Sequence, residues 1–190
     1  KNFSNKIWNS LRLLKSWTVS EKLSEPKTST IASKWFESKF NSKLNVVEDL
    51  FKKYRISDAL ITIYKLIWED YCSWYLEIIK PNYGESIDQV TYKKTIKYFK
   101  KCLKILHPFM PFLTEEIWSL IKEQKESSIT ISNWPNKGSI DSSYIENFQH
   151  TQKIITSMRK FRNVNGISAN KRIELLTKNK TDYNFEFKEI

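Results

Sequence analysis

The side chains that most often do catalytic chemistry are few in this chain. His107 stands between Leu106 and Pro108 in the stretch LHPFMPFLTEEIW, residues 106–118. A histidine placed between an apolar residue and a proline is more typical of a hydrogen-bonded packing residue than of a catalyst. We therefore expect His107 to help two helices meet at a corner that Pro108 and Pro111 create.

The remaining reactive groups also lack the spacing of a reaction centre. Cys72 and Cys102 are far apart in the sequence and form no C-x-x-C pattern, and His150 lies on a polar stretch. This arrangement predicts two reduced, buried thiols and no metal site. The neighbouring carboxylates Glu69 and Asp70 point in different directions on a helix, which favours structural partners over acid–base work. With no Gly-rich phosphate loop or nucleophile elbow, we predict no catalytic residue and no cofactor in this chain.

The charge of the chain indicates an anionic partner instead. Lys and Arg number 32 against 21 Asp and Glu, which gives a net charge of +11. Six lysines and no acidic residue fall between Lys93 and Lys104, and residues 150–180 hold eight basic residues against Glu174. Nucleic acid is the partner that such a surplus most often serves. An acidic protein or an anionic membrane surface is the alternative.

The elements that must position these residues are long helices. Only 3 Gly and 5 Pro are present, while 40% of the residues are hydrophobic and 14% aromatic. Apolar residues recur at helical spacing through most of the first 125 positions, and this spacing predicts that Trp68, Trp74 and Trp118 lie in the core. The predicted helices cover residues 2–17, residues 29–54, a third segment capped by Ser57-Asp58 and ended by Pro81, residues 89–106, and a fifth segment capped by Thr114 with Glu115 and Glu116 in its first turn.

The pattern changes after Lys125. An alternating β-branched run at Ile129–Ile131 predicts a short strand, and a helix over residues 142–164 should end at Asn165-Gly166. The run KRIELLT, residues 171–177, predicts another strand. The predicted fold is therefore mainly α, with an antiparallel helical bundle over residues 1–125 and a small β-α-β subdomain, an α+β appendage, over residues 126–190.

Two features bear on the protein's surroundings. No apolar run approaches the roughly 20 residues of a membrane span, and no signal peptide opens the chain, so we expect a cytoplasmic protein without a membrane partner. The chain begins without Met inside an amphipathic helix pattern, so we expect it to be a piece of a longer protein.

Two stretches carry a specific family resemblance. LHPFMPFLTEEIW together with DYCSWYLEIIKP, residues 70–81, resembles the anticodon-binding domain of class Ia aminoacyl-tRNA synthetases. The CSWYLEIIKP run is more similar to the valyl-tRNA synthetase family than to the isoleucyl or leucyl families. NKIWNSLR, RISDALITIYKLIWEDYCSWYLE, the WP pair at 134–135 and RKFRNVNGIS followed by KRIELL fit the same family in order, so the resemblance spans nearly the whole chain.

The resemblance implies a fragment of a ligase that joins valine to its tRNA with ATP. The catalytic and editing domains are then expected upstream of Lys1, because the class I signatures His-Ile-Gly-His and Lys-Met-Ser-Lys-Ser do not occur here. Nor does the long C-terminal coiled coil of valyl enzymes. We expect this chain to be monomeric, and its expected partners are tRNA(Val) and the catalytic and editing domains of the same longer protein. We expect it to form no aminoacyl bond by itself.

The first helix has the best placed candidates for reading RNA. At about 100° per residue, Asn5, Asn9, Arg12 and Ser16 share a stripe opposite the apolar one. Amphipathic helices need a polar face in any case, so spacing alone does not make this stripe a site. The resemblance adds that this helix faces the anticodon, with Arg12 stacking on or hydrogen bonding to a base. The predicted base-reading residues are Asn5, Trp8, Asn9, Arg12 and Ser16, and the predicted tRNA backbone contacts are Lys15, Arg159, Lys160 and Arg162.

Two other interpretations are open at this point. The chain could be the anticodon-binding domain of an isoleucyl or leucyl enzyme, or a basic helical scaffold module whose surface binds an acidic protein or membrane.

Overall fold

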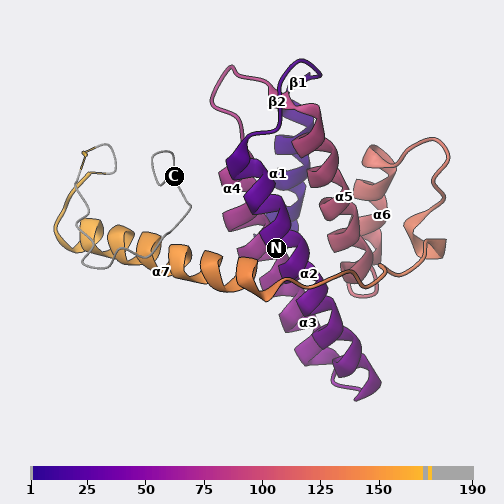
Figure 1. Cartoon of the computed structure of the whole chain (residues 1–190). Helices are drawn as coiled ribbons and strands as arrows, with labels where there is room; N and C mark the ends of the chain where they lie inside the picture. The colour runs from indigo at the N-terminus through magenta and orange to yellow at the C-terminus, as the bar shows by residue number, and fades with distance from the viewer. Residues whose placement is uncertain (1, 169–170, 173–190) are drawn as a thin grey trace. The chain divides into compact units, whose positions relative to one another are not determined.

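The computed structural model describes residues 2–168 and 171–172 of the chain. These residues are mainly α-helical, as the sequence predicts (Figure 1). They form two compact units, Lys1–Ile140 and Asp141–Ile190, which are described separately below. Residues 126–140, which the sequence pattern groups with the C-terminal subdomain, belong to the first unit in the structure. None of the helices in the described ranges is long and apolar enough to cross a membrane.

The first unit is built from helices joined by short connections. In chain order its elements are α1 (Asn2–Ser16), β1 (Val19–Ser20), α2 (Lys27–Lys52), α3 (Ile56–Lys65), the π-helical stretch η1 (Leu66–Tyr75), α4 (Leu76–Ile79), β2 (Ile87–Asp88), α5 (Gln89–Leu106), α6 (Pro111–Ile121) and the 3-10 turn η2 (Ile129–Ile131). The segments α3, η1 and α4 follow one another without a break and form the third helix of the bundle (Figure 1). No side chain caps its start, since α3 begins after Arg55 and Asp58 lies in its first turn.

Aromatic residues fill the centre of this bundle. The ring of Phe36 on α2 lies 5.1 to 5.3 Å from the rings of Tyr71, Tyr75 and Tyr98, which η1 and α5 supply. Buried tyrosines need partners for their hydroxyls. The Tyr98 hydroxyl donates to the Ser33 carbonyl, and the hydroxyls of Tyr71 and Tyr75 are also hydrogen bonded. The core therefore fixes α2 against α5 through both packing and hydrogen bonds.

The π-helical stretch η1 departs from the continuous α-helix that the sequence pattern predicts. Within this wider turn the Ser73 hydroxyl donates to the carbonyl of Trp68, which lies five residues earlier. The stretch buries Asp70 and Cys72. It leaves Trp68 and Trp74 half-buried, although the helical spacing had predicted both as core residues.

The proline corner starts α6 earlier than the sequence pattern predicts. The helix begins at Pro111, whose fixed φ suits the first helical position and whose missing N–H would be unpaired there anyway. Thr114 is therefore inside the helix instead of capping it, and its hydroxyl donates to the Met110 carbonyl. Glu115 and Glu116 consequently lie beyond the first turn.

His107 holds this corner together. Its Nδ1 lies 2.7 Å from the hydroxyl oxygen of Thr114, and its Nε2 lies 3.3 Å from that of Thr130. The side chain thus links the end of α5 to α6 and to η2. The prediction of a hydrogen-bonded packing histidine is confirmed.

A small parallel strand pair ties the loop after α1 to the start of α5. Val19 pairs with Ile87 and Ser20 with Asp88. The Asp88 carboxylate then caps α5 by accepting from the Thr91 backbone N–H at 2.8 Å. The polar stretch VSEKLSEPKTST, residues 19–30, predicts only a loop, because a two-residue strand has no periodicity to detect.

The predicted strand at Ile129–Ile131 is wrong, since these residues form the 3-10 turn η2. The Ser128 hydroxyl accepts from the Thr130 backbone N–H and starts the turn. Ile129 is buried while Ile131 is 73% exposed, so the two isoleucines do not share one face as they would in a strand. Within the described residues the only sheet is the β1–β2 pair.

The second unit contains α7 (Ser142–Val164). The helix ends as predicted at Asn165-Gly166, where Gly166 takes a φ of 61°. The N–H of Ile167 donates to the Arg162 carbonyl and that of Gly166 to the Asn163 carbonyl, which satisfies the last turn with a left-handed glycine. The predicted strand KRIELLT lies outside the described residues except for its first two positions.

Candidate nucleic-acid interface

Helix α1 presents the two faces that its sequence predicts. Ile7, Leu11 and Leu14 are buried and anchor the helix to the bundle. Burying a leucine or isoleucine side chain contributes about 1.5–3 kcal/mol, so this face is held firmly. On the opposite side the predicted RNA-reading stripe is exposed, and its members are Asn5, Asn9, Arg12 and Ser16, with Lys15 at its border.

The side chains of this stripe differ in the hydrogen-bond donors and acceptors that remain available to a ligand. Arg12 forms no hydrogen bond or ion pair with the residues that the structure describes, so its planar guanidinium keeps all its donors. The Ser16 hydroxyl already donates to the Leu13 carbonyl at 2.7 Å and keeps only its acceptor sites. Trp8 is half-buried, which leaves part of its ring at the surface. The structure thus places Asn5, Trp8, Asn9, Arg12 and Ser16 along one helix, with Arg12 as its most versatile member.

A polar network behind α1 fixes its position against η1. The buried Ser10 hydroxyl donates to the Lys6 carbonyl and lies 3.2 Å from the thiol of Cys72. The ammonium of Lys6 sits 5.7 Å from the centre of the Trp68 ring. These contacts explain why the π-helical stretch matters to α1: it brings Cys72 and Trp68 to the helix that carries the stripe.

An aromatic cluster beside α1 escaped the sequence analysis. The ring of Phe3 lies 4.7 Å from that of Tyr64, which stacks on Trp68 at 5.7 Å. Tyr64 is 37% exposed and Trp68 is half-buried, so the cluster reaches the surface. Helical spacing predicts Trp68 as a core residue, whereas in the π-helical stretch it is half-buried.

The residues of α7 that are predicted to contact the tRNA backbone belong to the second unit. Arg159 and Lys160 are exposed there. Arg162 instead donates from its two terminal nitrogens to the carbonyls of Ser168 and Lys171, at 2.6 and 2.8 Å. Its guanidinium therefore holds the segment that follows the helix, and the structure gives it a local role that the sequence pattern did not indicate.

The lysines of α5 are unequal in their partners. Lys94 pairs with Glu25 at 2.8 Å, and Lys100 pairs with Glu126. Lys104 donates to the Asn133 carbonyl. Lys93 and Lys97 are exposed, and the structure gives neither of them a partner among the residues that it describes.

The buried reactive groups are structural. Cys72 and Cys102 are free and buried, as predicted, and burial raises the pKa of both thiols, which keeps them protonated. Burial also raises the pKa of Asp70 to about 6, although Lys39, 3.8 Å away, opposes the shift. Among the described residues no three metal-ligating side chains are grouped to hold an ion.

Comparison with known proteins places this architecture in a family. The family model described as the anticodon-binding domain of tRNA ligase matches residues 33–177, more than half of the chain. That match begins after α1 and includes α5 and α6.

Individual relatives extend the similarity toward both ends of the chain. Valine–tRNA ligase of Christiangramia forsetii is 47% identical over 173 residues, which make up 90% of this chain and 20% of the relative. The enzyme of Parabacteroides distasonis is 42% identical over 92% of this chain and 20% of its own length, and that of Listeria innocua is 37% identical over 85% and 19%. The chain thus spans about a fifth of the length of the relatives that it matches. It belongs to the family of anticodon-binding domains of tRNA ligases.

Proposed function

We propose that this chain is the part of a valine–tRNA ligase that recognises the anticodon of tRNA(Val). The parent enzyme would attach valine to that tRNA with ATP in the cytosol, and its catalytic domain, not this chain, would bind the ATP. The observation that carries the proposal is the exposed polar stripe of α1, on a chain whose relatives are valine–tRNA ligases.

The chemistry of the stripe suits an anticodon loop. Sequence-specific recognition of RNA targets single-stranded loops, whose unstacked bases expose both their faces and their edges. Arg12 offers a planar cation for stacking, and the amides of Asn5 and Asn9 offer both donors and acceptors for base edges. Lys15 adds a charge for a phosphate at the border.

Two features of the chain limit the proposal to binding. The class I catalytic signatures do not occur in the sequence, and the reactive side chains in the described residues are buried or hold the fold. This chain would therefore supply base recognition, and other parts of the parent protein would supply catalysis. We propose that it acts there as a single copy.

A competition experiment tests the valine assignment. Transcripts of tRNA(Val), tRNA(Ile) and tRNA(Leu) would be measured for binding to the 190-residue chain at one moderate salt concentration. We expect tRNA(Val) to bind about tenfold tighter or better, since a well-read base contributes about 1–3 kcal/mol. Preference for tRNA(Ile) or tRNA(Leu) would move the chain to another class Ia enzyme, and no preference at all would favour a basic scaffold.

A further inference from the structure

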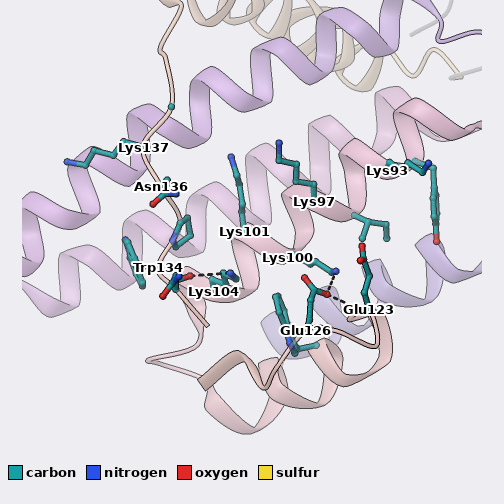
Figure 2. Close-up of a pocket in the computed structure, with 16 residues that line it drawn as sticks. Lys93, Lys97, Lys100, Lys101, Lys104, Glu123, Glu126, Trp134, Asn136 and Lys137 are labelled. Carbon is teal, nitrogen blue, oxygen red and sulfur yellow. Dashed lines mark hydrogen bonds and ion pairs between the residues drawn. The ribbon is translucent and has the colours of Figure 1, made fainter. Parts of the chain in front are cut away.

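A groove in the first unit lies against α5, and lysines are the most frequent residues in its lining. It has a volume of about 820 Å³, and its walls come from α5, Trp118 of α6, Glu123 and Glu126 just after α6, and residues 133–138 (Figure 2). Six lysines and two glutamates line it, so its charge is positive. A positively charged cavity of this size, with aromatic walls, suits a sizeable anionic ligand.

The structure shows which of these lysines are available. Lys100 is paired with Glu126, Lys104 donates to the Asn133 carbonyl, and Lys137 is paired with Glu48 at 2.7 Å. Lys93 and Lys97 remain exposed. The three interactions hold the walls in place and leave Lys93 and Lys97 without a partner among the described residues.

Lys101 joins the same row from a less polar setting. Figure 2 shows Lys97 and Lys101, which line the groove, extending from α5 away from Lys100, which bends toward Glu126. The Lys101 ammonium lies 5.4 Å from the centre of the Phe40 ring, and burial lowers its pKa. A partly desolvated ammonium gains more from an anionic partner than one that is fully hydrated.

The spacing of the row favours a polymer over a single anion. Lys93, Lys97 and Lys101 follow one another at intervals of four residues, which places successive charges about 6 Å apart along the helix. One phosphate can meet only one or two of them. A chain of regularly spaced phosphates can meet all three.

The other walls favour RNA over an acidic protein segment. Trp134 is half-buried and packs edge-on against Phe51, so it presents a ring at the groove without filling it. The amides of Asn133 and Asn136 stand beside it. Aromatic rings stack on bases, and amides bond to base edges and 2′-hydroxyls, so these walls offer contacts to the bases and sugars of RNA in addition to its phosphates.

We propose that this groove binds a sugar–phosphate segment of tRNA outside the anticodon, with its phosphates against Lys93, Lys97 and Lys101. The identification of the RNA as tRNA rests on the proposed function, whereas the positive charge and the lining of the groove do not. Because phosphates carry no sequence information, this contact strengthens the binding of every tRNA by the same factor and leaves the choice of anticodon to α1.

The test is a pair of matched double variants of the 190-residue chain. Lys93→Gln/Lys97→Gln removes two charges from the groove, and Lys27→Gln/Lys52→Gln removes two exposed charges from the ends of α2, which do not line it. We expect the groove variant to bind tRNA(Val) and tRNA(Ile) transcripts about tenfold more weakly each and to lower the salt slope by about 2. A groove variant that matches the α2 variant in affinity and slope overturns the proposal.

Chemical labelling supplies a second measurement that does not rely on variants. Acetic anhydride modifies accessible lysines, and mass spectrometry reports the extent at each site. Bound tRNA should protect Lys97 and Lys101 but not Lys52. If poly-glutamate of equal total charge protects them as well as tRNA does, the groove is a general anion surface and the RNA assignment is wrong.

The failure of this proposal and that of the proposed function can be told apart. Wild-type chain that binds tRNA(Val) and tRNA(Ile) equally would remove the valine assignment. A uniform loss in the groove variant would then still support the groove as an RNA contact.

Discussion

At the scale of single residues, the account depends most on Arg12. Its neighbours in the stripe are short polar side chains, and Ser16 is partly engaged by its own helix. Within the stripe, Arg12 alone combines a planar face with five donors at an exposed position. Base recognition should therefore be more sensitive to Arg12 than to any other member of the stripe.

Arg12→Ala should lower the affinity for tRNA(Val) by about tenfold, since a stacked base contributes about 1–3 kcal/mol. Affinity for tRNA(Ile) should change much less, because the lost contact is to a base and not to the backbone. Arg55→Ala serves as the matched control, since Arg55 is exposed and its ion pair with Asp58 is worth little. An equal effect of both variants would remove Arg12 from the site.

Asp70 gives a prediction about pH. Burial raises its pKa from 3.8 to about 6, so between these values the folded protein holds a proton that the unfolded chain has released. The contribution of Asp70 to the free energy of unfolding is therefore greatest below pH 4 and falls as pH rises to 6, by about 3 kcal/mol in all. The charges that face it, Lys39, Lys43 and Glu69, are included in this shift.

Asp70→Asn removes the titration and should gain stability relative to wild type as pH rises from 4 to 7. Urea unfolding at both pH values measures this difference. Asp49→Asn, which removes an exposed carboxylate on α2, controls for the change of charge. A difference between Asp70→Asn and wild type that stays constant with pH would show that the carboxyl is not desolvated.

At the scale of elements, the segment after α6 has to be held against α2 and α5 to form one wall of the groove. Gly138 lies where a Cβ would come within 2.6 Å of the Asn41 side-chain nitrogen. That nitrogen donates to the Ser139 carbonyl at 2.9 Å, and Asn41 is only 1% exposed. The close approach leaves room for hydrogen alone at position 138.

Gly138→Ala should therefore displace the Asn41 amide and cost about 1–3 kcal/mol, the penalty for a buried polar group that loses its partner. Thermal or urea unfolding measures the loss. In Ser139→Ala the backbone carbonyl that accepts from Asn41 is kept, so this neighbouring variant should be close to wild type. Equal stability of the two variants would mean that the segment is not anchored there.

The elements also show how far sequence reasoning reaches. The two faces of α1 and the end of α7 at Gly166 follow from local patterns, so both were predictable. The π-helical stretch was not predictable. The α-helical period predicts that Trp68 and Trp74 lie in the core, and it does not predict the burial of Asp70. The groove needed Trp134 and Asn136 to fold back on α5, and no local pattern reports a contact between segments that distant.

At the scale of the whole molecule, the candidate contacts divide by what they can read. The stripe on α1 has the planar and amide groups that distinguish bases, whereas the groove has a row of charges for phosphates. The exposed basic residues of α7 belong to a separate unit. Affinity and specificity should therefore respond to different variants and to salt in different ways.

The most direct test of the account is binding of the 190-residue chain to a valine anticodon stem-loop and to stem-loops with the middle or last anticodon base changed. Fluorescence anisotropy at one fixed salt concentration would give all the affinities on the same scale. The account predicts that each changed base weakens binding by about tenfold or more, in line with the 1–3 kcal/mol that a specific base contact contributes. Equal affinity for all the stem-loops would contradict it, because a surface that reads an anticodon cannot be indifferent to its bases.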